Sequence, residues 1–350
     1  MTVKALGAPA DDKPVAPLTI TLRAPGPKDV QIEIAFCVVC HSDLHTVRNE
    51  WGHTLYPSVP GHEIVGTVSA VGDAVTKYKV GDTVGVGCLV DSCGNCGACH
   101  DDLENYCENG WTGTYNGATD DAPGHTMGGY AQRIVVDEHF VLAIKHDKAQ
   151  LAAVAPLLCA GITTYSPLRH WGAGPGKTVG VVGIGGLGHM GIKIAKAMGA
   201  KVIAFTTSEA KRKDALDLGA DEVVISRDAD AMAAQAGTID LIIDTVSAGH
   251  NLDPFTAALK REGTLVLLGV PEQPHTSPSA GNLIFGRKAI AGSIIGGLAE
   301  TQEMLDFCAE HGIVSEIEMI KGAEIEDAYA RMLKSDVRYR FVIDNATLAQ

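Results

Sequence analysis

The stretch Val179-Gly-Val-Val-Gly-Ile-Gly-Gly-Leu-Gly-His189 is the strongest indication of this chain's fold class. Its first part, Val179–Ile184, is a short apolar run, as expected for a strand buried in a parallel sheet. The segment Gly186–Gly199 then carries apolar residues at helical spacing. These are Leu187, Met190, Ile194 and Met198. A strand that passes through a glycine-rich turn into an amphipathic helix is the first unit of a doubly wound α/β sheet.

Alternating strand and helix patterns continue after this unit. The predicted order is strand Lys201–Phe205, helix Glu209–Leu218, and strands Glu222–Ile225, Ile239–Asp244 and Thr264–Val270. Because strands that alternate with helices form parallel sheets covered on both faces, we predict a doubly wound Rossmann domain over residues 151–286.

The residues on either side of this domain have a different pattern. Residues 1–150 contain short strand-like segments broken by turns, at Asp29–Phe36, Glu63–Val71 and Val80–Val86. After the Rossmann domain we expect a strand at Ala289–Ile295, helices near Glu300–His311 and Ile325–Leu333, and a strand at Tyr339–Ile343. We predict that these elements return to the first half, so that residues 1–150 and 287–350 form one β-rich domain.

Size and composition fit a globular protein with two domains. The chain has 350 residues, more than one hydrophobic core usually organises, and 46% of them are apolar and 20% charged. The formal net charge of -14 disfavours nucleic acid and anionic membranes as partners. Because we find no run of about 18 apolar residues and no secretory signal pattern, we expect a cytoplasmic protein without a membrane partner.

The glycine-rich turn has the spacing of a dinucleotide-binding loop. Gly183, Gly185 and Gly188 follow a strand and open a helix, with Gly186 and Leu187 between them. Glycine at these positions allows a sharp turn and a close approach of the backbone to a pyrophosphate at the helix N-terminus. We therefore predict a dinucleotide cofactor at this loop.

The end of the second predicted strand favours NADP over NAD. An NAD site places Asp or Glu there to accept a hydrogen bond from the ribose 2′-hydroxyl, whereas a 2′-phosphate requires hydroxyls and a cation. The sequence places Thr206, Thr207 and Ser208 there, followed by Lys211-Arg212-Lys213. Glu209 is the feature that favours NAD, and the basic residues could instead form a solvated helix face.

Four cysteines, Cys93, Cys96, Cys99 and Cys107, lie in one short segment rich in Gly and Asn. This spacing lets one loop surround a zinc ion with four thiolates at about 2.3 Å each. Since four protein ligands leave no position for water, we predict a structural zinc in a lobe over residues 88–110. The alternatives are unrelated or redox-active thiols, and an iron–sulfur cluster, whose cysteine spacings differ.

A second set of metal-ligand types is dispersed along the chain. Cys40 lies in Cys-His-Ser-Asp-Leu-His, His62 and Glu63 lie in Gly-His-Glu, and Cys159 lies in Leu-Cys-Ala-Gly-Ile-Thr-Thr. Two thiolates and one imidazole leave a fourth position open on zinc, as Lewis-acid activation of an alcohol or carbonyl oxygen requires. The alternative for Cys159 is a core residue, because a lone buried cysteine is more often one.

Neighbouring residues can be given roles in such a site. Asp43 could hold the non-ligating nitrogen of His62, and Glu63 could be a supporting carboxylate or an alternate ligand. Ser42 could pass on a substrate proton. Asp43 could instead cap the following turn, and His45 could be an ordinary surface histidine. Cys88 and Cys308 have no neighbouring ligand pattern, so we expect them to pack in the core.

In this order, the motifs resemble those of zinc-containing medium-chain alcohol dehydrogenases, most of all the cinnamyl alcohol dehydrogenase group with its bacterial NADPH-dependent aldehyde reductases. The likeness runs from about Gly26 to Asp344 and includes Pro-Leu-Leu-Cys-Ala-Gly-Ile-Thr and Asp-Val-Arg-Tyr-Arg-Phe-Val. It implies a GroES-like catalytic domain in addition to the Rossmann domain. It also implies a homodimer formed through the strand near Ala289–Ile295.

The resemblance also implies roles for individual residues. Cys40, His62 and Cys159 would bind a catalytic zinc, with Glu63 as its exchangeable neighbour. Ser42 and His45 would form a proton relay, and Thr163 would contact the nicotinamide. Thr207, Ser208 and Arg212 would hold the 2′-phosphate, although the family usually has Lys where Arg212 stands.

Together these features predict reversible hydride transfer between NADP(H) and a primary alcohol or aldehyde, with two zinc ions per subunit. Two alternatives would use the same fold, namely a zinc-free quinone or enoyl reductase and a non-catalytic NADPH-binding protein. The four-cysteine lobe and the dispersed ligand trio argue against both.

Overall fold

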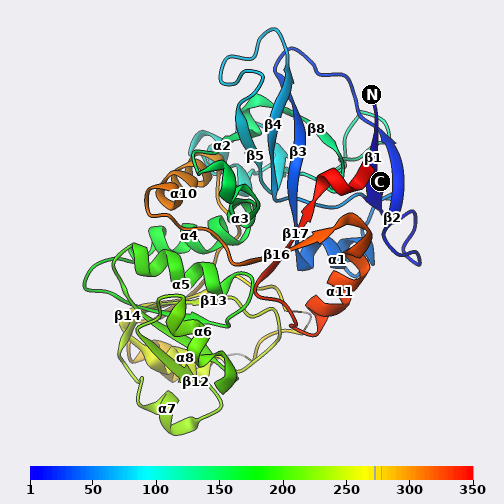
Figure 1. Ribbon diagram of the computed structural model, residues 1–350. Helices are drawn as coiled ribbons and strands as arrows, with labels where there is room; N and C mark the ends of the chain where they lie inside the picture. Colours follow the sequence, from blue (N-terminus) through cyan, green and yellow to red (C-terminus); the bar gives the residue numbers. More distant parts are fainter. Residues whose placement is uncertain (272, 277, 350) are drawn as a thin grey trace. The chain divides into compact units, whose positions relative to one another are not determined.

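The computed structural model describes residues 1–271, 273–276 and 278–349, and the chain divides into two compact units. One unit comprises Met1–Cys159 and Gly296–Gln350, and the other comprises Ala160–Ile295. Figure 1 shows the chain as a ribbon, with many of its helices and strands labelled. The domain limits predicted from the sequence, 150/151 and 286/287, lie slightly earlier in the chain at both boundaries.

A seven-stranded sheet forms the centre of the first unit, with its path in the order β16-β17-β3-β4-β5-β9. The strands are β3 Asp29–Val39, β4 Ile64–Val71, β5 Thr83–Val86, β8 Arg133–Asp137, β9 Leu142–Ala143, β16 Ile317–Lys321 and β17 Arg340–Asp344. On the edge of β3 opposite β4, β8 pairs with the first part of the strand and β17 with the last part. Because Phe341 pairs with Val39, the end of β3 and the start of β17 lie together.

Further strands and helices complete the first unit. They are β1 Thr2–Gly7, β2 Ala16–Thr21, α1 His41–Val47, β6 Leu89–Asp91, α2 Gly97–His100, η1 Glu104–Tyr106, β7 Thr112–Gly113, η2 Glu138–Phe140, η3 Lys148–Gln150, α3 Leu151–Val154, η4 Ala155–Leu158, α10 Leu298–Glu310, η6 Gly322–Glu324, α11 Ile325–Leu333 and η7 Asn345–Ala349. The segment α3–η4 packs against β3 and β4, which places Cys159 with this unit.

A six-stranded parallel sheet in the order β12-β11-β10-β13-β14-β15 forms the second unit. Its elements are α4 Ala160–His170, β10 Thr178–Val182, α5 Gly188–Ala197, β11 Lys201–Thr206, η5 Glu209–Lys211, α6 Arg212–Asp217, β12 Glu222–Ile225, α7 Ala229–Ala233, β13 Ile239–Asp244, α8 Asp253–Ala258, β14 Leu259–Leu267, α9 Ala280–Ile284 and β15 Ala289–Gly292. This strand order is that of a doubly wound Rossmann sheet, so the predicted α/β fold class is confirmed.

The last strand of this sheet corrects one expectation. We expected the strand at Ala289–Ile295 to return to the first half of the chain, but β15 pairs in parallel with β14. The pattern of a short apolar strand does not specify its partner, and β14 offers an unpaired edge within the same unit. The strand therefore closes the Rossmann sheet.

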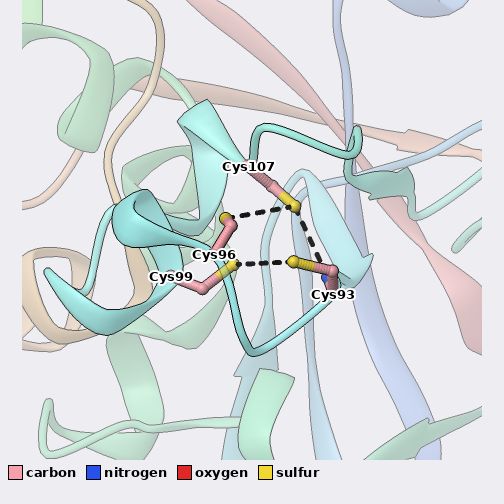
Figure 2. A group of neighbouring side chains, drawn as sticks. All are labelled: Cys93, Cys96, Cys99 and Cys107. Carbon is pink, nitrogen blue, oxygen red and sulfur yellow. Dashed lines mark hydrogen bonds between the residues drawn. The ribbon is translucent and has the colours of Figure 1, made fainter.

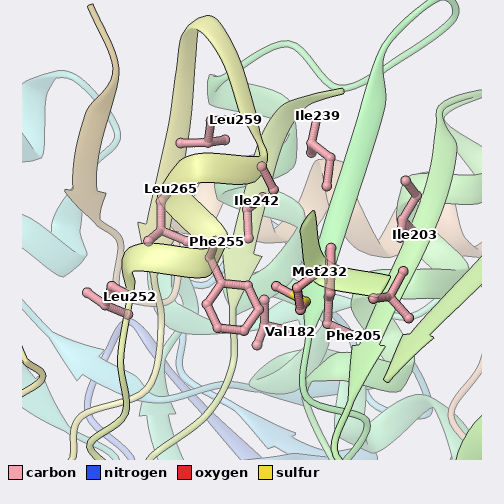
Figure 3. Close-up of a cluster of buried hydrophobic side chains, with 12 residues drawn as sticks. Val182, Ile203, Phe205, Met232, Ile239, Ile242, Leu252, Phe255, Leu259 and Leu265 are labelled. Carbon is pink, nitrogen blue, oxygen red and sulfur yellow. The ribbon is translucent and has the colours of Figure 1, made fainter. Parts of the chain in front are cut away.

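Side chains of α7, α8 and the five strands β10 to β14 form a core on one face of this sheet. Figure 3 shows Phe255 of α8 close to Phe205 of β11 and Met232 of α7. The two phenylalanine rings meet edge to face, with centroids 5.5 Å apart. This core supports the carboxyl ends of β10, β11 and β13, where the functional loops begin.

No single helix in the described ranges is long and apolar enough to cross a membrane. The consecutive helical segments 148–158 and 160–170 meet those criteria only when joined. The first packs against β3 and β4 and the second against α5 and β13, as the core helices of a globular fold do.

Candidate functional site

The four cysteines of the predicted lobe face one another. Figure 2 shows the sulfur atoms of Cys93, Cys96, Cys99 and Cys107 turned toward a common centre. The Sγ atoms of Cys93 and Cys99 are 3.9 Å apart, and those of Cys96 and Cys107 are also 3.9 Å apart. Thiolates that surround zinc tetrahedrally at about 2.3 Å lie about 3.8 Å from one another, so the donor set and its spacing fit zinc.

Backbone groups support these sulfur atoms. The amide of Cys93 donates to Sγ of Cys107, and the amide of Glu108 donates to Sγ of Cys96, both at 3.4 Å. Such hydrogen bonds stabilise thiolates. The lobe is joined to α10 by Glu104, whose carboxylate accepts a hydrogen bond of 3.0 Å from the amide of Leu298.

A second group of ligand atoms, from Cys40, His62, Glu63 and Cys159, gathers in the first unit within 4.8 Å of one another. Cys40 lies at the end of β3, His62 and Glu63 directly before β4, and Cys159 directly after η4. All four residues are buried. The neighbouring strands β3 and β4 and the packing of η4 on them therefore bring together residues that are far apart in the sequence.

The carboxylate of Asp43 contacts this group and fixes the position of its residues. Its carboxylate lies 3.3 Å from Nδ1 of His62 and accepts hydrogen bonds from the amides of Cys40 and Gly61, at 2.8 and 3.0 Å. The hydroxyl of Tyr130 donates to the same carboxylate at 3.2 Å. Asp43 therefore does both things that the sequence suggested separately, since it contacts His62 and caps the first turn of α1.

Glu63 forms a buried ion pair with Arg340, a residue for which the sequence analysis gave no role. The guanidinium of Arg340 contacts Oε1 of Glu63, and both side chains are almost fully buried. Burial raises the pKa of Glu63 to about 8, although the charge of Arg340 opposes this shift. The other oxygen, Oε2, is buried and has no hydrogen-bond partner among the described residues. One carboxylate oxygen therefore remains available as a ligand.

A third thiol, that of Cys88, lies beside the two predicted thiol ligands, Cys40 and Cys159. Sγ of Cys88, in the turn between β5 and β6, is 3.9 Å from the carbonyl oxygen of Leu158. Interaction with the thiol of Cys159 lowers the pKa of Cys88 and holds the pKa of Cys40 well below its usual value. We expected core packing for Cys88, but the structure places it half-buried beside this group.

The two predicted relay residues lie on α1. Ser42 and His45 are three residues apart, so they share one face of the helix. The hydroxyl of Ser42 lies 3.8 Å from Sγ of Cys40. Nδ1 of His45 pairs with the carboxylate of Glu50 at the surface. The pair thus extends from the ligand group toward solvent.

The glycine-rich loop joins β10 to α5 as the motif predicts. Gly183 has a φ of +87°, which only glycine adopts without strain, and a Cβ on Gly188 would lie 1.9 Å from the carbonyl oxygen of Gly183. A Cβ on Gly185 would meet no atom within 4 Å, so the space beside this residue is open. Gly186 and Leu187 complete the turn, and Leu187 is the N-cap of α5.

The residues predicted to bind the 2′-phosphate follow the end of β11. Thr207 is exposed, Ser208 is half-buried, and Arg212 begins α6. Arg212 pairs with Glu209 and also donates to the carbonyl of Val223 at 2.8 Å. Glu209, the residue that favoured NAD, is therefore partly neutralised by the cation that favours NADP.

Lys211 contacts the glycine-rich loop, which the sequence analysis did not predict. Its ammonium group donates to the carbonyl oxygen of Ile184 at 2.8 Å. The basic run Lys211-Arg212-Lys213 gave the signal for a cation here, but the helix geometry decides which side chain reaches the loop. Thr163, the predicted nicotinamide contact, is buried in the first turn of α4, shortly after Cys159.

Comparisons with known proteins agree with this arrangement. Residues 26–146 match the family model for the alcohol dehydrogenase GroES-like domain, and residues 186–310 match that for zinc-binding dehydrogenases. The chain belongs to the zinc-binding alcohol dehydrogenase family. This dehydrogenase is 68% identical over 348 residues to the aldehyde reductase YahK of Escherichia coli, with 99% of each chain covered.

Two further relatives are similar over nearly the whole length of this dehydrogenase. It is 55% identical to the NADP-dependent alcohol dehydrogenase C 1 of Mycolicibacterium smegmatis, with 99% of each chain covered. The structure of a cinnamyl alcohol dehydrogenase from Sorghum bicolor superposes with a TM-score of 0.94 at 46% identity, covering 99% of this chain and 98% of that one. The resemblance inferred from the motifs is confirmed.

Proposed function

We propose that this dehydrogenase catalyses reversible hydride transfer between NADP(H) and a primary alcohol or aldehyde, aliphatic or aromatic. The observation that carries the proposal is the convergence of Cys40, His62 and Cys159 in one buried group, with Glu63 beside them. The aldehyde reductase and NADP-dependent alcohol dehydrogenase named above support the reaction class. The four-cysteine lobe favours this function over that of a zinc-free reductase or a non-catalytic protein.

The donor set suits one zinc ion in each of the two groups. Four thiols in the lobe make a closed structural site, whereas Cys40, His62 and Cys159 leave a position for substrate. A zinc ion in the second group would supply Lewis-acid chemistry toward the substrate oxygen. Because Arg340 balances the charge of Glu63, the two thiolates are the main negative charges offered to that ion.

The protein's own residues hold the ligands and move the proton. Asp43 accepts from the His62 ring and fixes its orientation, so that the opposite nitrogen faces the thiols. The hydroxyl of Ser42 would take up or return the substrate proton, and His45 would exchange it with solvent. Glu63, with Oε2 free of hydrogen-bond partners in the described part of the chain, would serve as the exchangeable ligand.

NADP(H) would supply or accept the hydride, held by the loop Gly183–Gly188. The open space at Gly185 supports a close approach of the pyrophosphate to the backbone. Thr207, Ser208 and Arg212 would bind the 2′-phosphate, with Lys211 close to the loop. Thr163 would contact the nicotinamide.

We also propose a homodimer in the cytoplasm. The edge strand β15 and exposed apolar side chains nearby, Val270, Ile284 and Phe285, support a self-association surface on the Rossmann unit. All nine cysteines are free of disulfides and most lie in ligand groups, which supports a reducing compartment.

The reaction is tested by steady-state rates on matched aliphatic and aromatic aldehydes, each with NADPH and NADH. We expect turnover with both classes and a higher kcat/KM with NADPH. Absence of turnover with every aldehyde and alcohol, in protein that holds zinc and binds NADPH, would contradict the proposal.

A further inference from the structure

Three side chains with metal-binding groups meet in the Rossmann unit, apart from the sites described above. They are Asp244, His250 and His275, and their ligand atoms lie within 4.8 Å of one another. Asp244 ends β13, His250 lies in the loop that follows, and His275 lies in the loop between β14 and α9. Ligands of open α/β sheets bind at these carboxyl ends of the strands.

The backbones of the two loops pair with each other, and this pairing keeps the three side chains close together. Asn251 and Thr276 form a parallel β-bridge between the loops. The amide of His250 donates to Nδ1 of His275 at 3.4 Å. The two imidazole rings meet edge to face with centroids 4.8 Å apart.

The hydrogen bonds around His250 turn a lone pair toward a carboxylate. Nδ1 of His250 lies 2.9 Å from the carbonyl oxygen of Ala248, which can only accept, so Nδ1 carries the proton. In the neutral ring Nε2 is therefore an acceptor. It lies 3.0 Å from Oδ2 of Asp244, another acceptor. A positive charge must lie between these two atoms for the contact to be favourable.

Each of the three residues also has a buried polar atom without a hydrogen-bond partner in the described part of the chain. Oδ2 of Asp244 and the Nε2 atoms of His250 and His275 are buried, and none has a hydrogen bond to a described residue. The other carboxylate oxygen of Asp244 accepts from the amide of Val246 at 3.1 Å, which fixes the direction of Oδ2. Buried polar atoms without partners are costly, so a ligand is expected here.

Apolar side chains close one side of the group. The ring of Phe255 lies edge to face on His250, with centroids 5.6 Å apart, and Phe205 packs behind Phe255. Figure 3 shows both phenylalanines in the core beneath this end of the sheet. Asp244 itself is only 1% exposed. Water therefore reaches these atoms poorly from the core side, which strengthens their interaction with a cation.

We propose that Asp244, His250 and His275 form a third metal site, for a divalent transition metal such as zinc. Two imidazoles and one carboxylate suit Zn²⁺, Co²⁺ or Ni²⁺ better than Mg²⁺ or Ca²⁺. Ligands at about 2.0–2.2 Å from zinc lie roughly 3.3 Å apart, close to the spacing of Asp244 and His250. Binding through Nε2 of His275 would move its proton to Nδ1 and end the weak contact with the His250 amide. The ion would join the loop after β13 to the loop before α9.

The test counts zinc ions on the folded holoprotein by native mass spectrometry, after dialysis against micromolar Zn²⁺ at pH 8. We expect three ions per chain for the wild type and two for Asp244→Asn and His275→Gln. Asp244→Asn is nearly isosteric, and its amide can donate to Nε2 of His250, so the variant should fold without the ion. His170→Gln is the matched control, because His170 is an exposed histidine of the same unit that belongs to none of the three ligand groups; it should keep three ions.

A cobalt titration gives an independent readout. Co²⁺ at the third site should add absorption bands without the thiolate charge-transfer bands of the two cysteine groups, and these added bands should be lost in both variants. Two ions on the wild type at every Zn²⁺ concentration would overturn the proposal, since a proton would then bridge Asp244 and His250. A third ion retained in both variants would also overturn it. Failure of the proposed function would give a different result. Zinc would then be missing from the two groups that contain cysteine, and not from Asp244, His250 and His275.

Discussion

The guanidinium of Arg340, at the start of β17, is buried against the carboxylate of Glu63, immediately before β4. The pairing of β17 and β4 with the two edges of β3 brings these residues together from opposite ends of the sequence. Burial raises the pKa of Glu63, and the charge of Arg340 opposes that rise. The ion pair therefore couples the stability of the sheet to the charge of the ligand group.

Replacing Arg340 by Met should leave the buried Glu63 without its partner. Loss of one member of a buried ion pair costs about 3–5 kcal/mol, so we expect a decrease of that size in the free energy of unfolding in urea. The control is Arg331→Met, since the ion pairs of Arg331 are partly exposed and should contribute about 1 kcal/mol or less. Equal effects of the two substitutions would contradict this account of Arg340.

Substitutions in the glycine-rich loop should separate folding from cofactor binding. Gly188→Ala places a Cβ 1.9 Å from a backbone oxygen and should lower stability, whereas Gly185→Ala meets no atom within 4 Å and should change stability by less than about 0.5 kcal/mol. The methyl group at position 185 should nonetheless weaken NADPH binding, which fluorescence titration measures. Unchanged NADPH affinity in Gly185→Ala would place the pyrophosphate elsewhere.

Removing the charge of Arg212, the first residue of α6, should lower activity with NADPH and leave activity with NADH unchanged. A hydrogen bond to a charged group contributes about 1.5–3 kcal/mol, so Arg212→Ala should reduce kcat/KM for NADPH by roughly 10-fold to 100-fold. Lys213→Ala is the control, because Lys213 is highly exposed and pairs with Asp217 on the same helix. An equal loss of kcat/KM with NADH would show that Arg212 supports the folded structure and does not bind the 2′-phosphate.

Breaking the structural lobe should remove one zinc and lower stability. Cys107→Ala takes away one of four converging thiols, so we expect one zinc fewer per chain and a lower Tm by calorimetry. Cys308→Ala also shortens a buried cysteine, but Cys308 lies in neither cysteine group and its loss should leave the zinc content unchanged. Wild-type zinc content in Cys107→Ala would rule out the lobe as a zinc site.

A charged residue in place of the most exposed apolar residue of the proposed dimer surface should weaken the dimer. Phe285 is 93% exposed, and Phe285→Asp should weaken self-association by roughly 30-fold, since loss of an aromatic anchor costs about 2 kcal/mol. Light scattering over a concentration series measures the mass. Leu333→Asp, at an exposed apolar position of the other unit, should leave the mass unchanged. A monomer in the wild type, or a dimer unaffected by Phe285→Asp, would contradict the surface.

Local patterns predicted the Rossmann elements well and their partners less well. The predicted strands Glu222–Ile225 and Ile239–Asp244 have the bounds of β12 and β13, because apolar runs between turns mark buried strands. The helix predicted over Glu209–Leu218 divides into η5 and α6, and β14 begins earlier than its predicted strand. The pairing of β15 with β14 was missed, since strand partners depend on tertiary contacts that periodicity does not encode.

The sequence predicted the ligand residues but not all of their neighbours. The residue types and their neighbours made Cys40, His62, Glu63 and Cys159 candidates, and the family resemblance implied that they form one ligand group; the structure brings them together. Arg340 was missed, although a charged residue at the start of the apolar strand Arg-Phe-Val-Ile was a usable signal. Asp244, His250 and His275 gave no signal because they lie in loops, whose contacts follow from the fold.

The proposed function requires that Cys40, His62 and Cys159 hold a zinc ion on which turnover depends. The most direct measurement compares wild type with Cys159→Ala for zinc per chain, NADPH binding and kcat/KM on an aldehyde panel. We predict one zinc fewer, unchanged NADPH affinity and loss of turnover with every aldehyde. Retained turnover with one zinc fewer, or an unchanged zinc content, would contradict this role of the three ligands.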